Sequence, residues 1–386
     1  MFCVRILILQ PMLKFYRVAF YHELNSLLTA RGHQLRVVFG TPSAEESKRR
    51  DNSELFLDFC HFERSYWLLG NRLHVHSNSL RHVLWADLII TEQANKHFYN
   101  YLLYLLRALR VKRFCLWGHG FNRQGEARNW REAFKKYLAV HTDWWFAYSA
   151  SVVDYLVGLG FAPNKITQLN NSIDTVVFKR GLSAVTEAEL LDFKRRQRIA
   201  GEARVGLFCG SLHKDKHVEF LLQAALKIRL AEPNFVLLLI GDGQDRDIVQ
   251  RYADHYEFIK PLGMLIGAEK CLAFRSAEAL LIPGMVGLGI LDGFCAGLPL
   301  FTTRHTLHSP EIDYLRPGYN GLCSDFQVDA YAALVAAALA DSERLAALRR
   351  HALESSNHYS IQQMAWNFAA GVEGCIAALG LSASKY

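Results

Sequence analysis

Short apolar runs alternate along most of the chain with longer stretches in which apolar residues recur every three or four positions. Apolar runs of roughly four to eight residues are typical of strands buried on both faces, and the helical spacing between them is typical of the crossover helices of βαβ units. The pattern therefore predicts an α/β fold built on parallel sheets.

Two series of strands are predicted. The first covers residues 4–9, 34–39, 86–90, 113–117, 144–148 and 166–169, with helices over 17–31 and 94–109. The second covers residues 205–209, 235–240, 258–259, 279–282 and 300–303. A polar, charged helix over 186–198 separates the two series, so we expect two Rossmann-like domains, residues 1–180 and 181–359. The tail over 342–379 has helical spacing, and the pattern leaves open which domain it packs on.

Charge is distributed unevenly between the two halves. Residues 1–180 hold 24 Lys and Arg against 14 Asp and Glu, a net charge of +10, whereas residues 181–386 hold 20 against 23, a net charge of −3. The first half is therefore expected to meet an anionic partner, such as a membrane surface or a lipid-linked phosphate, with a solvated basic face as the alternative. Nucleic acid is not expected, because the basic residues are spread over many elements and no recognised module accompanies them.

The chain has the composition of a reduced, water-soluble protein. Its eight cysteines form no C-x-x-C pair, and Arg5 interrupts the first apolar stretch, which predicts a strand rather than a signal peptide. The apolar run over 279–291 is too short to span a bilayer. We expect a cytoplasmic protein with peripheral contact to the inner face of the cytoplasmic membrane.

Residues suited to phosphate and ribose binding follow strands of the second series. Gly210 ends a strand in FCGSLHKDKHVEF, and Lys216 stands where the next helix begins, a combination that suits a diphosphate; a turn with solvent-facing lysines is the alternative. In PGMVGLGILDGF, Gly284, Gly287 and Gly289 precede Asp292, whose carboxylate suits a ribose hydroxyl pair. Close helix packing would explain these glycines but not the acid.

Other strand ends offer further candidates. Gly241 in IGDGQDRD is expected to adopt an unusual backbone dihedral angle. His119, between two glycines, suits a contact with a substrate hydroxyl or phosphate. Glu92 suits the orientation of an acceptor hydroxyl, with a helix-dipole role as the alternative. Glu311, in HSPEIDYL, is interpreted as a first-turn acid with a structural role.

Several common chemistries have no sequence support. The chain lacks a G-x-x-x-x-G-K-[ST] loop, a G-x-S-x-G elbow, an H-E-x-x-H motif and Cys/His metal spacing. No metal and no cofactor is therefore expected.

The sequence segments that follow the predicted strands resemble those of glycosyltransferase family 4, which has the GT-B fold. The resemblance covers nearly the whole chain, from LQPMLKFYRVAFYHEL through WGHGFNRQ to HSPEIDYLRPGYNGL. It implies a hexosyltransferase (EC 2.4) that uses a UDP- or GDP-linked sugar and acts with retention and without metal. It also implies an acceptor-binding first domain, a donor-binding second domain, and a C-terminal helix, about 360–386, that crosses back to the first domain.

The resemblance also implies roles for individual residues. Lys216 would bind the donor diphosphate, Asp292 would take the place of the second acid of the E-x(7)-E motif, and His119 would sit near the transferred sugar. The predicted catalytic residues are His119, Lys216 and Glu92. The predicted donor-binding residues are Gly210, Ser211, Lys216, Gly241, Gly284, Val286, Gly287, Leu288 and Asp292. The predicted acceptor-binding residues are Arg17, Asn95, Asn122 and Arg123.

The sequence departs from the family pattern at two donor positions. Gly284 replaces the first acid of E-x(7)-E, and Ser211 replaces the arginine that accompanies the phosphate lysine. The expected reaction is transfer to a hydroxyl of a glycan or a polyprenyl-diphosphate-linked acceptor in bacterial surface polysaccharide or glycolipid synthesis. An inverting enzyme would need a base, for which His119 and Glu92 are the candidates. A nucleotide-sugar 2-epimerase and a non-catalytic nucleotide-sugar binder remain as alternatives.

Overall fold

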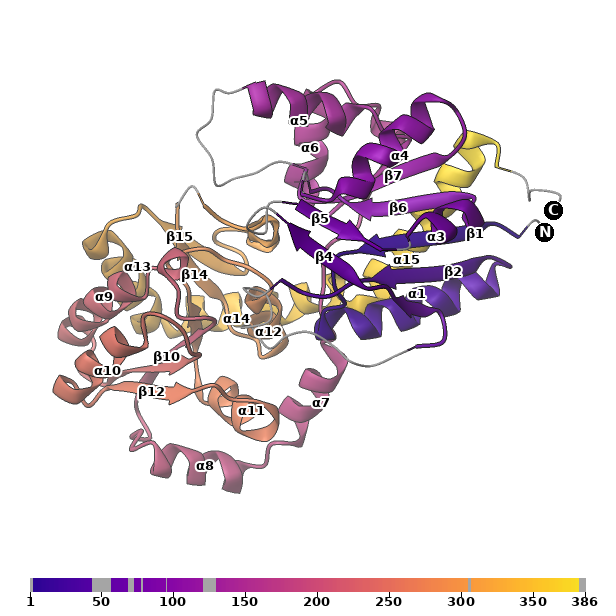
Figure 1. Ribbon diagram of the computed structural model, residues 1–386. Coiled ribbons are helices and arrows are strands. Elements are labelled where there is room, and N and C mark those ends of the chain that lie inside the picture. Colours follow the sequence, from indigo (N-terminus) through magenta and orange to yellow (C-terminus); the bar gives the residue numbers. More distant parts are fainter. Residues whose placement is uncertain are drawn as a thin grey trace. The chain divides into compact units, whose positions relative to one another are not determined.

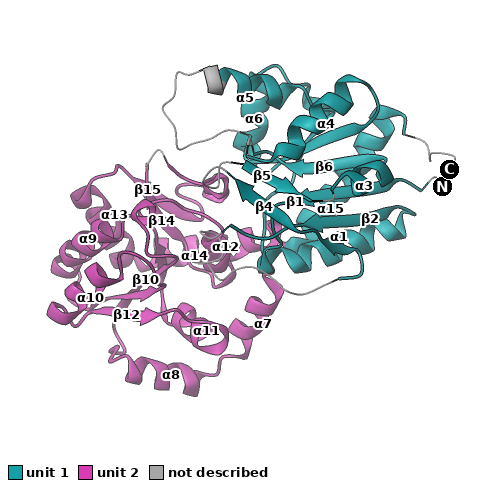
Figure 2. Cartoon of the chain, in the orientation of Figure 1, with its two compact units in different colours: residues 1–173, 361–386 teal, residues 174–360 magenta. Residues whose placement is uncertain are grey.

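The computed structural model describes residues 3–43, 57–68, 73–77, 79–94, 96–120, 130–304 and 307–381 (Figure 1). The chain divides into two compact units, residues 1–173 with 361–386 (unit 1) and residues 174–360 (unit 2) (Figure 2). The boundary expected at residue 180 falls inside α7 (Val176–Ala184), which packs on helices of unit 2, so the division lies between Ile173 and Asp174.

Unit 1 is built on a parallel sheet of seven strands. In spatial order they are β3 (Cys60–Phe62), β2 (Gln34–Phe39), β1 (Arg5–Gln10), β6 (Leu88–Glu92), β7 (Arg113–Gly118), β8 (Trp144–Ala147) and β9 (Ile166–Gln168). The central strands are buried on both faces, which is why they are recognisable as continuous apolar runs. The parallel fold class predicted from these runs is confirmed.

Helices cover both faces of this sheet (Figure 1). One face carries α1 (Val18–Ala30) and α15 (Ile361–Leu379), and the other carries α3 (Ser79–Trp85), α4 (Phe98–Ala108), α5 (Trp130–Val140) and α6 (Ala150–Gly158). Gly32, shortly after α1, has φ 82°, a conformation that glycine adopts without strain and that ends the helix. Phe368 of α15 stacks on Phe146 of β8 with 4.3 Å between ring centroids, so the C-terminal helix is part of the core of unit 1. Among the described residues, no helix is long and apolar enough to cross a bilayer.

An antiparallel hairpin of β4 (Ser65–Leu68) and β5 (Leu73–His76), absent from the predicted elements, brings buried histidines into unit 1. His74 and His97 are fully buried, and their Nδ1 atoms lie 3.2 Å apart. Burial lowers the pKa of His74 to about 3 and that of His76 to about 4, and it holds the pKa of His97 well below its usual value. The folded protein therefore keeps these three imidazoles neutral.

This cluster predicts that the protein loses stability in mild acid. An unfolded histidine titrates near pH 6.5, so below that pH the unfolded chain binds protons that the folded chain does not, and folding loses about 1 kcal/mol per pH unit for each buried histidine. Thermal unfolding between pH 7 and pH 4.5 should show a steep fall in Tm. His76→Leu should make the fall shallower, whereas substitution of the exposed His255 by Gln should leave it unchanged. Equal slopes for both variants would contradict the prediction.

Unit 2 repeats the architecture around a second parallel sheet. Its strands, in spatial order, are β12 (Ile259–Gly263), β11 (Phe235–Ile240), β10 (Arg204–Cys209), β13 (Ala279–Leu281), β14 (Leu300–Thr303) and β15 (Gly321–Ser324). Its helices are α7, α8 (Glu187–Arg196), α9 (Val218–Ala231), α10 (Arg246–His255), α11 (Gly267–Ser276), α12 (Gly289–Cys295), α13 (Val328–Ala340) and α14 (Ser342–His358). Two 3-10 turns, η3 (Lys214–Lys216) and η4 (Pro310–Tyr314), follow β10 and β14. The strand β15 and the helix α7 were not predicted.

Candidate functional site

Three loops meet at the carboxyl ends of strands in unit 2: the first follows β10, the second follows β13 and the third follows β14. The N–H of Met285 donates to the carbonyl of Asp215 at 2.7 Å, which joins the second loop to the first. The N–H of Ser309 donates to the carbonyl of Val286 at 3.1 Å, and the N–H of Val286 donates to Nδ1 of His308 at 3.2 Å, which joins the second loop to the third. Because the carboxyl ends of parallel strands are where α/β sheets bind ligands, this layer of loops is the candidate site of unit 2.

Lys216 lies within this layer. Its ammonium donates to the carbonyl of Met285, and the next residue, His217, adopts a left-handed conformation at φ 51° that turns the chain into α9. Burial lowers the pKa of Lys216, while the nearby carboxylates of Glu311 and Asp215 oppose the shift. A cation held against a loop of backbone amides suits a phosphate ligand.

Glu311 contributes a buried carboxylate to the same neighbourhood. Only 3% of it is exposed, and its charge is close enough to raise the pKa of Lys216. From the sequence, Glu311 was predicted to have a structural role because it stands in the first turn after Pro310. The sequence did contain a signal for a place at the edge of the site, because Glu311 follows a strand of the second series.

Glycines let the loops approach one another closely. A Cβ at Gly284 would lie 2.5 Å from the carbonyl oxygen of Asp215 and from the carbonyl carbon of Lys216, so the position has no room for a side chain. Gly241 has φ 147°, and a Cβ there would lie 1.8 Å from the carbonyl oxygen of Gly210, which confirms the unusual dihedral angle expected of it.

The loop between β13 and α12, which holds Gly284 and Gly287, has two backbone N–H groups without an acceptor among the described residues. The N–H groups of Gly287 and Leu288 donate to no residue that the structure describes. By contrast, Val286, which the sequence analysis included among the donor-binding residues, is fully buried and has its N–H bonded to His308. The loop therefore presents its amides at 287 and 288 rather than at 286.

Asp292, on α12, is buried with 8% of its surface exposed and pairs with a lysine that the sequence analysis missed. The carboxylate Oδ2 accepts from Nζ of Lys270, on α11, at 2.7 Å. Cys209, at the end of β10, lies close to both charges and to Lys216, and burial raises the pKa of its thiol to about 12. Lys216, Asp292 and Lys270 thus share one end of the sheet.

Two of the predicted residues of unit 1, His119 and Arg17, contact Tyr148, which directly follows β8. The exposed His119 lies edge-on to the Tyr148 ring, 4.6 Å between centroids. Arg17 is only 6% exposed, and its guanidinium donates to Asn171 Oδ1 at 2.6 Å and to the Tyr148 hydroxyl at 3.4 Å. Internal bonds therefore hold the Arg17 side chain, which was predicted to bind the acceptor.

Glu92 ends β6, next to β7 in the sheet, and is half-buried with its carboxylate 4.0 Å from Nε2 of His97. The structure therefore brings Glu92 and His119 to neighbouring strand ends. The predicted acceptor residues Asn95, Asn122 and Arg123 lie outside the described residues.

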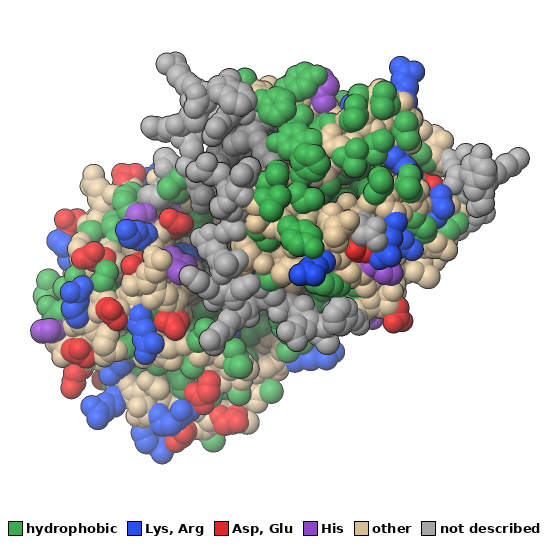
Figure 3. Space-filling model, in the orientation of Figure 1, with side chains coloured by type: hydrophobic (Ala, Val, Ile, Leu, Met, Phe, Trp, Pro, Cys, Tyr) green, Lys and Arg blue, Asp and Glu red, His purple; other side chains and the backbone are tan. Residues whose placement is uncertain are grey.

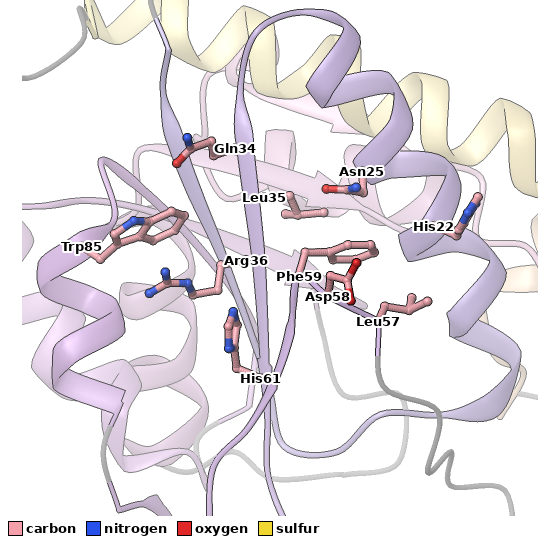
Figure 4. Close-up of a pocket in the computed structure, with 10 residues that line it drawn as sticks. All are labelled: His22, Asn25, Gln34, Leu35, Arg36, Leu57, Asp58, Phe59, His61 and Trp85. Carbon is pink, nitrogen blue, oxygen red and sulfur yellow. The ribbon is translucent and has the colours of Figure 1, made fainter.

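A cavity of about 640 Å³ opens elsewhere in unit 1 (Figure 4). It is lined by the first residues of β2, by α1, by the segment around Phe59 and by Trp85, whose ring lies 3.9 Å from the Arg36 guanidinium carbon. These are the amino-terminal ends of the strands, the opposite end of the sheet from Glu92 and His119. Of the predicted site residues that the structure describes, none lines the cavity.

Two family models match most of the chain. Residues 19–177 match "Glycosyltransferase Family 4", and residues 191–355 match "Glycosyl transferases group 1". The fold and the matches together define an enzyme that transfers sugars, with two Rossmann-like units as in the GT-B fold class. The chain belongs to the family 4, group 1 glycosyltransferases.

Solved structures share the fold over the full length. A glycosyltransferase from Rickettsia africae is 14% identical, with 98% of this chain and 99% of that chain covered and a TM-score of 0.70. The HepE protein of Anabaena, solved in complex with UDP, is 13% identical, with 96% and 99% covered and a TM-score of 0.67.

A curated relative matches a shorter segment. The alpha-monoglucosyldiacylglycerol synthase of Acholeplasma laidlawii is 23% identical over 146 residues, which is 36% of this chain and 36% of that protein. The chain therefore matches only about a third of the length of this relative.

Proposed function

We propose that this glycosyltransferase moves a hexose from a UDP- or GDP-linked donor, bound by unit 2, to a hydroxyl of a glycan or a polyprenyl-diphosphate-linked acceptor, bound by unit 1. The observation that carries the proposal is the presence of Lys216, Asp292 and the open N–H groups of Gly287 and Leu288 at one edge of the second sheet. The UDP complex of HepE and the glycolipid activity named for the Acholeplasma relative support the donor and acceptor classes.

The group that the enzyme must stabilise in this reaction is the leaving diphosphate. Negative charge grows on it as the glycosidic bond breaks and the sugar becomes oxocarbenium-like. The Lys216 ammonium and the two open amides stabilise that charge, and Asp292 accepts from the ribose hydroxyls. His119 contacts the transferred sugar or the incoming hydroxyl. We propose that the donor configuration is retained, that no metal takes part, and that the product enters bacterial surface polysaccharide or glycolipid.

The first test is thermal stabilisation by a panel of UDP- and GDP-sugars, since a ligand that binds the native state raises its Tm by mass action. A shift confined to one nucleotide sugar, and lost in Asp292→Ala, is expected. Asp329→Ala, which removes an exposed aspartate of unit 2 that pairs with Lys227, is the matched control and should keep the shift. The absence of any shift in the wild-type protein would overturn the proposed donor class. Conversion of the donor without an acceptor would favour an epimerase.

We further propose that unit 1 contacts anionic membrane through an apolar face. Figure 3 shows apolar side chains gathered over the part of unit 1 that holds α4, where Phe98, Leu105 and Leu109 are 52%, 55% and 63% exposed. Phe134 and Tyr137 of α5 are also exposed, with Lys136 beside them. Apolar side chains flanked by basic ones favour an interfacial position on anionic lipid.

The membrane proposal predicts sedimentation with liposomes that contain anionic lipid, and release by salt. The double variant Leu105→Glu with Leu109→Glu should lose at least about tenfold in the bound fraction, because two charges would have to enter the lipid interface. Leu230→Glu, at an exposed leucine of unit 2, should bind as the wild type does. If liposomes leave the wild-type protein in the supernatant, the membrane proposal is wrong.

A further inference from the structure

Asp292 and Lys270 form a close, largely buried ion pair at the edge of the candidate site. Lys270 Nζ lies 2.7 Å from Oδ2 of Asp292, and the two side chains are 23% and 12% exposed. Burial lowers the pKa of Lys270, but the Asp292 carboxylate and the neighbouring Cys209 together outweigh burial and raise this pKa above its usual value. The ammonium of Lys270 therefore stays protonated in the folded protein.

Aromatic rings hold the ammonium of Lys270 in place. The nitrogen lies 4.7 Å from the ring centroid of Phe178 and 5.6 Å from that of Phe274, and the two rings pack edge-on with 5.1 Å between centroids. A cation over two ring faces is attracted by their quadrupoles. The lysine thus has a fixed position even before any ligand binds.

Only one carboxylate oxygen of Asp292, Oδ2, accepts a hydrogen bond from a described residue. Oδ1 of Asp292 makes no hydrogen bond to any described residue, although the Asp292 side chain keeps some exposure at the site edge. A buried carboxylate with one oxygen anchored and the other open is oriented to accept from a ligand, because unpaired acceptors in partly buried positions are costly.

We propose that Lys270 is a positioning residue of the donor site: it anchors Oδ2 of Asp292 so that Oδ1 accepts a hydrogen bond from a ribose hydroxyl of the donor nucleotide. The inference rests on the proposed function, since it assumes a nucleotide at this edge of unit 2. It adds a residue of α11 to a site otherwise made of loops and α12. An aspartate has few rotatable bonds, so an anchored oxygen sets the direction of the other.

The experiment compares the affinities of UDP and of 2′-deoxy-UDP, and of GDP and 2′-deoxy-GDP, by calorimetry on the full chain. The wild-type protein should prefer the ribonucleotide by about tenfold, the magnitude of one hydrogen bond to a charged group. Lys270→Met should bring the preference close to one while the deoxynucleotide affinity stays within about twofold, because only the ribose contact is misdirected. Lys270→Arg, which keeps the charge, should preserve most of the preference.

Controls separate this outcome from a structural role. Lys227→Met removes another lysine–aspartate pair of unit 2 and should leave the preference unchanged. Because Lys270→Met leaves Asp292 buried without its partner, Lys270→Gln is the second variant and should also lose the preference. If either neutral variant keeps the wild-type ratio, or weakens both nucleotides equally, the positioning role is wrong. A wild-type protein that binds neither UDP nor GDP would instead refute the proposed function.

Discussion

Lys216→Met should lower kcat/KM by at least about a hundredfold, because a preorganised charge that stabilises the leaving diphosphate is worth several kcal/mol in the transition state. The ammonium is held against the loop by the carbonyl of Met285 and is flanked by Glu311 and Asp215. Methionine preserves the length and apolar stem of the side chain but removes the charge. The loss should therefore appear in turnover more than in stability.

The measurement is steady-state transfer with the nucleotide sugar that stabilises the wild-type protein. Lys214→Met is the matched control, because Lys214 lies on the same η3 turn and is exposed. That variant should stay within about threefold of the wild type, as expected of a solvated surface charge. Comparable losses in the two variants would assign the effect to the turn rather than to the Lys216 charge.

Gly284→Ala should destabilise unit 2 by about 2–3 kcal/mol, because overpacking against atoms that cannot move is costly. The Cβ would lie 2.5 Å from the Asp215 carbonyl oxygen and 2.6 Å from that of Lys216. Both belong to backbone that the hydrogen bond from Met285 holds in place. Restoring a glutamate at this position, as the family motif would have it, should fail for the same reason.

Thermal unfolding measures the effect. For a unit of this size, such a loss corresponds to a fall in Tm of roughly 5–10 °C. Gly287→Ala is the control on the same loop. Among the described residues, a Cβ there would meet only the Ser309 hydroxyl, at 3.9 Å, and the Tm of this variant should change by less than about 2 °C. If Gly284→Ala unfolds at the wild-type temperature, the loops are less tightly joined than the structure indicates.

The sheets were predictable because parallel strands buried on both faces are apolar throughout. The predicted strands over 34–39 and 235–240 match β2 and β11 residue for residue. The elements that were missed are short or polar. The strand β5, Leu73–His76, alternates apolar residues with two histidines, and nothing local indicates that both imidazoles become buried.

The residues of the candidate site also fall into two groups, those that the sequence predicted and those that only the structure revealed. Lys216 and Asp292 were predicted as donor-binding residues because each follows a strand and one or more glycines, a local pattern with a known physical use. Lys270 and Glu311 were not found as partners of the site, since each lies on a different element from the residue it faces. Arg17, which the family resemblance placed among the acceptor-binding residues, donates to Asn171 and Tyr148 in the structure, and the local sequence pattern did not predict these two contacts.

Sequence alone determined the two parallel sheets, the order of their strands along the chain, and the loops that carry glycine, lysine and aspartate at the strand ends. Those features depend on periodicity and on backbone freedom, which act over a few neighbouring residues. The tertiary structure alone decided that Lys270 pairs with Asp292, that Gly284 has no room for the family's acid, and that α1 is a helix on which α15 packs. These depend on side chains from distant segments that meet only when the helices pack on the sheets, because close packing, rather than local pattern, selects each partner.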